Sequence, residues 1–168
     1  NYLQISNKIY IIYKSKSENK LGYFQTELIE AISPKYFNDK KRTSLLLSAT
    51  SLLKNLLPDY QPNNKIYNSF SHLINNLENE SWPIIYIFWE LNLIKELGFN
   101  PNLNMFKDKT GQGINFINCE IDNVKYNVPI FLIKNETPKN ITNSMIRKSL
   151  IFTRSILQNK FFIPNNLI

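Results

Sequence analysis

Residues 81–98 read SWPIIYIFWELNLIKELG, and this stretch decides the class of the fold. Ser81 is a residue type that caps helix N-termini, proline is tolerated in a first turn as at Pro83, and glycine is favoured just after a helix end as at Gly98. The middle of the stretch, residues 84–91, is apolar almost all round. A helix of that kind lies in the centre of a bundle. The stretch therefore predicts a buried central helix in a mainly helical domain.

Two predicted helices precede this stretch and one follows it. Apolar residues recur with helical spacing from Arg42, and Pro58 ends that helix because proline cannot continue it. A second helix is predicted over about 63–77 and a last one over about 142–159. The side chains expected to face inward in the first two helices are Leu46, Ala49, Leu53, Leu56 or Leu57, Ile66, Phe70, Leu73, Ile74 and Leu77.

The segment after the central helix is predicted to be a small β-containing insertion near residues 104–135. Residues 107–113 have the composition of a polar loop, and 114–126 are predicted to hold two short strands that turn at Asp122-Asn123. Residues 129–138 fit no single pattern.

The first thirty-odd residues have the pattern of strands. Two runs rich in β-branched and aromatic residues, 2–14 and 21–32, flank a polar segment that suits a hairpin connection. A lone two-stranded hairpin is marginally stable in water, so we expect these strands to belong to a larger sheet. The chain also opens without a methionine, and both observations predict that further strands precede it. A domain boundary is predicted near Ser33-Pro34.

Charge and cysteine content restrict the kind of partner and compartment. The formal net charge is +7 over 168 residues, which favours a polyanionic partner such as nucleic acid. No apolar run reaches the roughly 20 residues needed to span a bilayer, so no membrane association is expected. Cys119 is the only cysteine, which fits a reducing cytoplasm and a small buried side chain.

The inventory of catalytic residues is poor. His72 is the only histidine, no motif supplies it with a partner, and Cys119 has no companion ligand, so neither acid–base catalysis nor a zinc site is expected. The sequence GQG at 111–113 lacks the rest of a phosphate loop and is interpreted as a turn. Glu90 is costly inside an apolar helix and is predicted to have a structural partner. We therefore predict no enzyme activity, no metal and no cofactor.

Three groups of basic residues are candidates for phosphate contacts. If the first strand is continuous, one of its faces carries Lys8, Tyr10, Ile12, Lys14 and Lys16. Ammonium groups beside an aromatic ring are the combination that holds single-stranded nucleic acid. The alternative is an ordinary solvated face of a barrel.

The other two groups are predicted at the strand–helix junction and on the last helix. The junction group is Lys40, Lys41 and Arg42, together with Lys35. The helix group is Arg147, Lys148 and Arg154, followed by Lys160. Arg147 and Arg154 are seven residues apart and so share one helix face. A solvated loop and a solvated helix face are the respective alternatives.

Two stretches of this sequence resemble the RecO family of recombination mediators. One is LGYFQTELIE at 21–30, which is followed by a predicted helix and LPDYQP at 57–62. The better one is FWELNLIKELGFNPNL at 88–103. It resembles the central helix of that family, with an aromatic entry, a Glu-Leu pair and a Leu-Gly-aromatic exit.

The resemblance implies an OB-fold barrel, in which residues 1–33 would be the last strands of an incomplete domain, and a helical C-terminal domain over 34–168. It implies a bacterial, cytoplasmic, nucleoid-associated protein that binds single- and double-stranded DNA and anneals strands in recombinational gap repair. The implied partners are RecR and the C-terminal tail of the single-strand-binding protein. Many members carry a cysteine zinc motif after the central helix. Here Met105 and Phe106 stand where the first cysteine is expected, so that metal site is expected to be lost.

Two other classes of function remain open at this point. The chain is alternatively a helical docking scaffold for repair partners, without DNA binding of its own. Measured affinity for labelled single-stranded DNA distinguishes the scaffold from the mediator. A small metal-dependent nuclease is the third possibility, and incubation of DNA with Mg²⁺ or Mn²⁺ tests it. The DNA-binding, strand-annealing mediator is the leading hypothesis.

Overall fold

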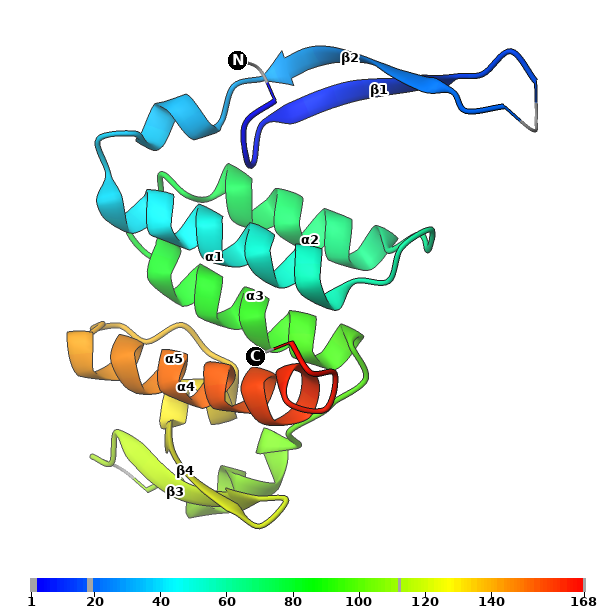
Figure 1. Cartoon of the computed structure of the whole chain (residues 1–168). Helices are drawn as coiled ribbons and strands as arrows, with labels where there is room; N and C mark the ends of the chain where they lie inside the picture. Colours follow the sequence, from blue (N-terminus) through cyan, green and yellow to red (C-terminus); the bar gives the residue numbers. More distant parts are fainter. Residues whose placement is uncertain (1–2, 18–19, 112, 168) are drawn as a thin grey trace. The chain divides into compact units, whose positions relative to one another are not determined.

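The structure is a computed structural model that describes residues 3–17, 20–111 and 113–167, and it is mainly helical (Figure 1). The mainly helical class predicted from the sequence is therefore confirmed. Contacts divide the chain into two units, Asn1–Leu57 and Pro58–Ile168. Gln112, the centre of the predicted GQG turn, lies outside the described residues. Within the described ranges no helix has the length and apolarity that a membrane span requires.

The first unit begins with a two-stranded antiparallel hairpin, β1 (Lys8–Lys14) and β2 (Tyr23–Glu30). The two strands lie within the ranges predicted from composition. At the turn, the Ser15 hydroxyl donates to the carbonyl oxygens of Ser17 at 2.6 Å and Lys20 at 2.9 Å. Every residue of both strands is exposed or half-exposed. The described strands thus form an open two-stranded sheet, and a closed OB-fold barrel stays a prediction.

Asn7 fixes the chain where it leaves the hairpin. The side-chain oxygen of Asn7 accepts hydrogen bonds from the backbone N–H groups of Ile32 at 2.9 Å and Ser33 at 3.0 Å. A short 3₁₀ helix, η1 (Ser33–Tyr36), follows directly. The predicted domain boundary near Ser33-Pro34 lies in this 3₁₀ helix, inside the first unit, whereas contacts divide the chain after Leu57. The division into a barrel and a helical domain stays a prediction.

The first unit ends with α1 (Lys40–Leu56), where the sequence predicted a helix that Pro58 stops. Leu45, Leu46 and Ala49 are its buried residues. The predicted inward positions Leu46 and Ala49 are therefore confirmed.

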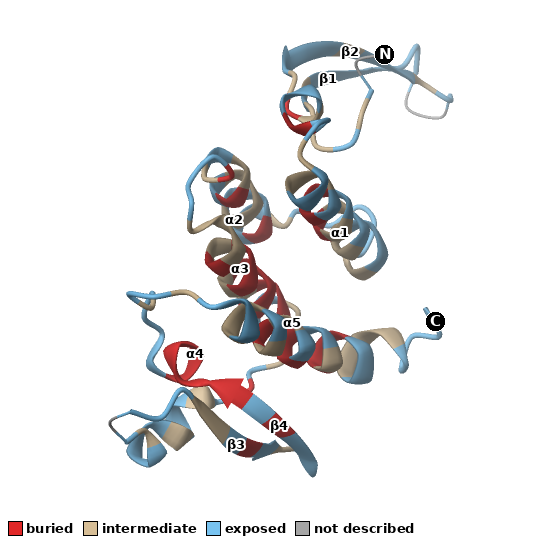
Figure 2. Ribbon diagram, turned by 90° about the vertical axis from the view of Figure 1, so that its left-hand side faces the viewer, coloured by how far each residue is buried: buried red, intermediate tan, exposed pale blue. Residues whose placement is uncertain are grey.

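The second unit is built around α3 (Trp82–Glu96), which packs against both α2 (Asn64–Asn75) and α5 (Asn143–Leu157). Figure 2 shows buried residues along α3, in agreement with eight buried positions of its fifteen. Gly98 has φ +99°, the left-handed conformation predicted for the residue after the helix. The central buried helix is confirmed, although Ser81 makes no side-chain cap hydrogen bond.

The remainder of the second unit contains the predicted small sheet. Strands β3 (Phe116–Ile121) and β4 (Val124–Pro129) pair antiparallel and turn at Asp122 and Asn123, whose φ values of 48° and 63° suit a tight hairpin. The 3₁₀ helix η2 (Leu103–Lys109) precedes them, so the predicted polar loop at 107–113 is wrong for its first residues. The unassigned segment folds as α4 (Ile130–Lys134), and a π turn, η3 (Gln158–Phe162), continues α5.

Candidate nucleic-acid interface

The hairpin brings part of the first predicted group onto one face. The regular ladder pairs Tyr10 with Glu27 and Lys14 with Tyr23, which places Tyr10 and Lys14 on the same side of β1. The prediction of one continuous face from Lys8 to Lys16 is wrong. The strand ends at Lys14, and the register of the ladder shifts between Lys8 and Ile9.

One carboxylate, Glu30, lies at the base of the hairpin. Glu30 is opposite Lys8 in the ladder and accepts a hydrogen bond from the Lys35 ammonium at 2.8 Å. That hydrogen bond, and then the charges of Lys35 and Lys8, lower the pKa of the Glu30 carboxyl. Lys35 of the junction group is therefore already engaged with an acid.

Positive charge without an ion-pair partner among the described residues gathers instead at the tip of the hairpin. The ammonium-bearing side chains there are Lys14, Lys16 and Lys20, all exposed and without an ion pair to any described residue. Tyr10, further down the strand, is 54% exposed and offers a ring for stacking. Lys20 was missed in the sequence because it lies in the predicted hairpin connection and not in a strand.

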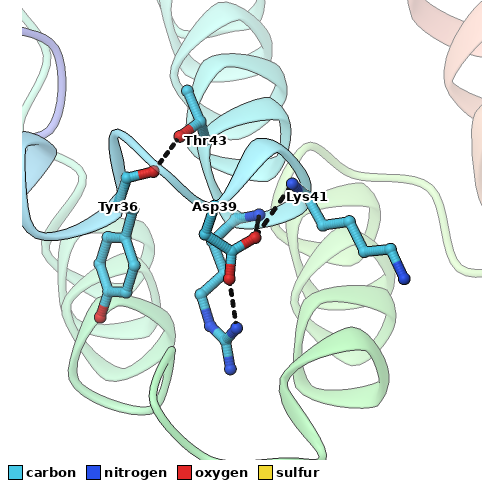
Figure 3. Close-up of polar contacts among 5 residues, drawn as sticks. Tyr36, Asp39, Lys41 and Thr43 are labelled. Carbon is cyan, nitrogen blue, oxygen red and sulfur yellow. Dashed lines mark hydrogen bonds and ion pairs between the residues drawn. The ribbon is translucent and has the colours of Figure 1, made fainter.

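The junction group is divided by Asp39, the N-cap of α1 (Figure 3). Its carboxylate accepts hydrogen bonds from the backbone N–H groups of Lys41 at 3.1 Å and Arg42 at 3.0 Å, and from the Arg42 guanidinium at 2.5 Å. The backbone and side-chain hydrogen bonds of Arg42 hold the pKa of Asp39 below its ordinary value. Arg42 thus has a local counterion, whereas Lys40 and Lys41 are exposed and pair with no acid among the described residues.

The helix group separates into two surfaces. Arg147 and Arg154 line one shallow groove of about 480 Å³ on α5, together with the apolar side chains of Ile146, Leu150 and Ile151. The predicted common face of the two arginines is therefore confirmed. Lys148 lies elsewhere, because its ammonium stands 3.9 Å from the centre of the Phe116 ring on β3.

Glu90 explains part of the position of Arg154. Glu90 is completely buried, and the Thr153 hydroxyl donates to its carboxylate at 2.5 Å. The Arg154 guanidinium lies 3.7 Å from the other carboxylate oxygen and remains about half exposed. Burial raises the pKa of Glu90, while hydrogen bonds from Thr153 and Tyr86 and the Arg154 charge oppose that rise. The predicted structural partner of Glu90 is confirmed.

The side chains considered for catalysis or metal binding are scattered. His72 is exposed on α2, and Cys119 is buried on β3, where burial raises the pKa of its thiol. No three His, Cys, Asp or Glu side chains cluster as metal ligands in the part of the chain that the structure describes. Met105 is exposed on η2, at the position considered for a first zinc cysteine.

Comparison with known proteins finds one family model and several relatives that match this chain. The family model described as "Recombination protein O C terminal" matches residues 38–105. The DNA repair protein RecO of Wolbachia sp. subsp. Drosophila simulans is 31% identical over 129 residues, which cover 68% of this chain and 54% of that protein. RecO of Ehrlichia chaffeensis is 31% identical over 126 residues, covering 67% and 52%. The chain belongs to the RecO family.

The match confirms the resemblance that the sequence showed. This RecO chain spans about half the length of the curated relatives it matches. The more distant RecO of Rhodospirillum centenum is 29% identical over 97 residues, covering 58% of this chain and 39% of that protein. No solved structure is significantly similar to this RecO chain.

Proposed function

We propose that this chain acts in recombinational gap repair as a DNA-binding and strand-annealing mediator that performs no covalent chemistry. The observation that carries the proposal is its similarity to several proteins named DNA repair protein RecO. The net charge of +7 supports a polyanionic substrate. By analogy with these bacterial relatives, we place its activity in the bacterial cytoplasm, at the nucleoid.

The proposed DNA contacts are the groups of exposed cations described above, and the hairpin tip is the principal one. Lys14 and Lys16 would contact phosphates, Tyr10 would stack on a base, and Lys8 would add charge at the base of the strand. Lys40 and Lys41 would add a second contact, since neither has a described counterion. Arg42 and Arg154 would contribute less, because each already faces a carboxylate.

We further propose that the hairpin is part of an OB-fold barrel. Its second face carries cross-strand pairs of apolar and aromatic residues, among them Ile9 with Leu28 and Tyr13 with Phe24. Tyr13 and Phe24 are 57% and 67% exposed, with ring centres 5.4 Å apart. An apolar sheet face of this kind is stable when further strands or a core cover it. The opposite face, with Tyr10 and Lys14, would then be the solvent and DNA side.

RecR and the C-terminal tail of the single-strand-binding protein are the proposed protein partners. The α5 groove combines apolar side chains with the guanidinium groups of Arg147 and Arg154, which suits a peptide that carries both apolar and acidic residues. A protein-docking scaffold without DNA binding is the second candidate, and the prior engagement of Arg42 and Arg154 favours it. Lys148 does not line the groove, because its ammonium lies over the ring of Phe116.

An annealing assay with the whole chain tests the proposal. Two complementary single strands carrying a donor and an acceptor fluorophore are mixed with and without protein, and duplex formation is followed by energy transfer. We expect the protein to accelerate annealing, because it neutralises phosphates that repel each other. Absence of acceleration together with background affinity for either strand would favour the docking scaffold.

A further inference from the structure

A second cavity in the Pro58–Ile168 unit shares no residue with the three basic groups. It has a volume of about 620 Å³ and is lined by residues from the end of α3, from η2 and the segment before it, and from α4. The α4 residues of the lining follow those of α3 and η2 by at least 25 positions in the sequence, and contacts between α4 and η2 bring them together. Its volume lies within the range of roughly 300–1,000 Å³ that is usual for small-ligand sites.

The cavity is positively charged and contains no internal counterion. Lys95, Lys107 and Lys134 line it, and no carboxylate does. None of the three ammonium groups forms an ion pair with a described residue, in contrast to Arg42, Lys65 and Lys160, each of which has an acidic partner. Three cations around one cavity repel each other, and an anion inside it would relieve that repulsion.

The remaining lining provides both an apolar floor and amide groups. Leu91 and Leu132 are 5% and 3% exposed, and the half-buried ring of Phe88 adds a flat surface. Five asparagines complete the wall. Each asparagine amide both donates and accepts hydrogen bonds, as pairing with the edge of a nucleobase requires. An inorganic anion would use the lysines and leave the apolar floor and these amides without a role.

We propose that this lysine–asparagine pocket binds a terminal nucleotide through its phosphate monoester, with the base against the apolar floor. A monoester carries close to two negative charges at neutral pH, whereas an internal phosphodiester carries one, so three unpaired lysines match a strand end better than a strand interior. This proposal rests on the DNA-binding function proposed above and deepens it. The ligand class is a 5′- or 3′-phosphorylated end of single-stranded DNA or a free nucleoside monophosphate.

The test compares strands that differ only in their terminal group. The affinity of the whole chain is measured by fluorescence anisotropy for one internally labelled single strand, bearing either a hydroxyl or a phosphate at each end in turn. We expect a preference of about tenfold for a phosphorylated end, the effect of one additional charge-assisted contact. Free deoxyadenosine monophosphate and inorganic phosphate serve as competitors, and competition by the nucleotide but not by phosphate identifies the base as part of the ligand.

A triple variant and a matched control locate the preference. Lys95→Gln, Lys107→Gln and Lys134→Gln together remove three charges from the pocket, and we expect them to abolish the preference for the phosphorylated end. Lys54→Gln, Lys125→Gln and Lys139→Gln remove the same charge from exposed positions outside the pocket, and the preference should survive. Circular dichroism melting confirms that both variants are folded. In the wild type, the methyl resonances of Leu91 and Leu132 should also shift on addition of deoxyadenosine monophosphate, which needs no variant.

The outcomes separate this proposal from the proposed function. Equal affinity for hydroxyl and phosphate ends, with no methyl shift, overturns the pocket while DNA binding stands. Nucleotide binding that the pocket variant abolishes, with no strand binding, supports the pocket for a free nucleotide and overturns the DNA-binding function. Displacement of the nucleotide by a short Asp- and Phe-containing peptide of higher affinity overturns the nucleotide assignment in favour of a protein ligand.

Discussion

Individual charged residues in this chain differ mainly in whether a counterion is already beside them. Glu90 and Thr153 meet although they are 63 residues apart, and Asp39 holds Arg42 across one helical turn. The sequence predicted a partner for Glu90 because an unpaired carboxylate in an apolar helix is costly. It did not predict which residue, because the partner lies on another helix.

Glu90→Gln tests the cost of the buried carboxylate. Burial raises the pKa of Glu90 in the folded state above its ordinary value of 4.5, so the wild type loses stability as the pH rises from about that value through the folded pKa. We expect Glu90→Gln to melt at or above the wild-type temperature at neutral pH, and the difference to shrink as the pH falls towards 4. Thermal unfolding across pH 4 to 8 measures this. A difference that stays constant with pH would contradict the account. The variant should not lose affinity for DNA, because the change removes a negative charge beside Arg154 and no positive charge.

Asp39 offers a second test, in which the effect of the helix cap on stability is separated from the effect of the charge on DNA affinity. Asp39→Ala removes the N-cap acceptor and should lower the melting temperature by a few degrees, whereas Asp39→Asn keeps a capping oxygen and should lower it less. Both changes remove the negative charge beside the Arg42 guanidinium, so both should increase affinity for single-stranded DNA if the junction group contacts phosphates. An unchanged affinity in both variants would remove the junction group from the proposed interface.

At the scale of the elements, local sequence patterns predicted those features that local chemistry determines. The turn at Asp122-Asn123 was predicted correctly because Asp and Asn tolerate the left-handed conformation. The groupings of lysines were predicted less well. Lys148 on α5 lies over the ring of Phe116, which belongs to β3. Lys95, Lys107 and Lys134 line one cavity only because α4 packs on η2. Neither fact follows from helix or strand period, which describes one element at a time.

The hairpin depends on Gly22, because Tyr13 and Lys14 approach this glycine closely. The backbone N–H of Gly22 donates to the Tyr13 hydroxyl at 3.1 Å, and a Cβ there would lie 2.4 Å from the Tyr13 ring and 2.5 Å from the Lys14 carbonyl oxygen. Gly22→Ala should therefore loosen the hairpin tip, raise amide hydrogen exchange in β1 and β2, and weaken DNA binding. Gly111→Ala is the matched control, because its nearest neighbour is the end of the Ile114 side chain at 3.2 Å. Equal exchange rates in the wild type and Gly22→Ala would show that the hairpin does not need this contact.

For the whole molecule, family membership and the mainly helical fold were predictable because the central helix carries both a packing pattern and a family pattern. The barrel stays a prediction that rests on the family resemblance, and the path of DNA was not predictable, since it depends on surfaces that no single segment specifies. We also predict that no zinc copurifies with the chain, because its one cysteine and one histidine cannot form a closed tetrahedral site. Elemental analysis that found one zinc per chain would contradict this.

The central claim is that this RecO chain binds DNA through exposed cations, and salt dependence measures it most directly. The affinity of the whole chain for a labelled single strand is determined by anisotropy across salt concentrations, for the wild type and for two variants. One variant replaces Lys8, Lys14 and Lys16 with alanine, and the other replaces Arg147, Lys148 and Arg154. We expect the wild-type affinity to fall steeply with salt, little affected by base sequence, and the hairpin variant to lower the slope of log affinity against log salt by roughly two. Background affinity in the wild type at low salt, or an affinity that salt does not change, would contradict the claim.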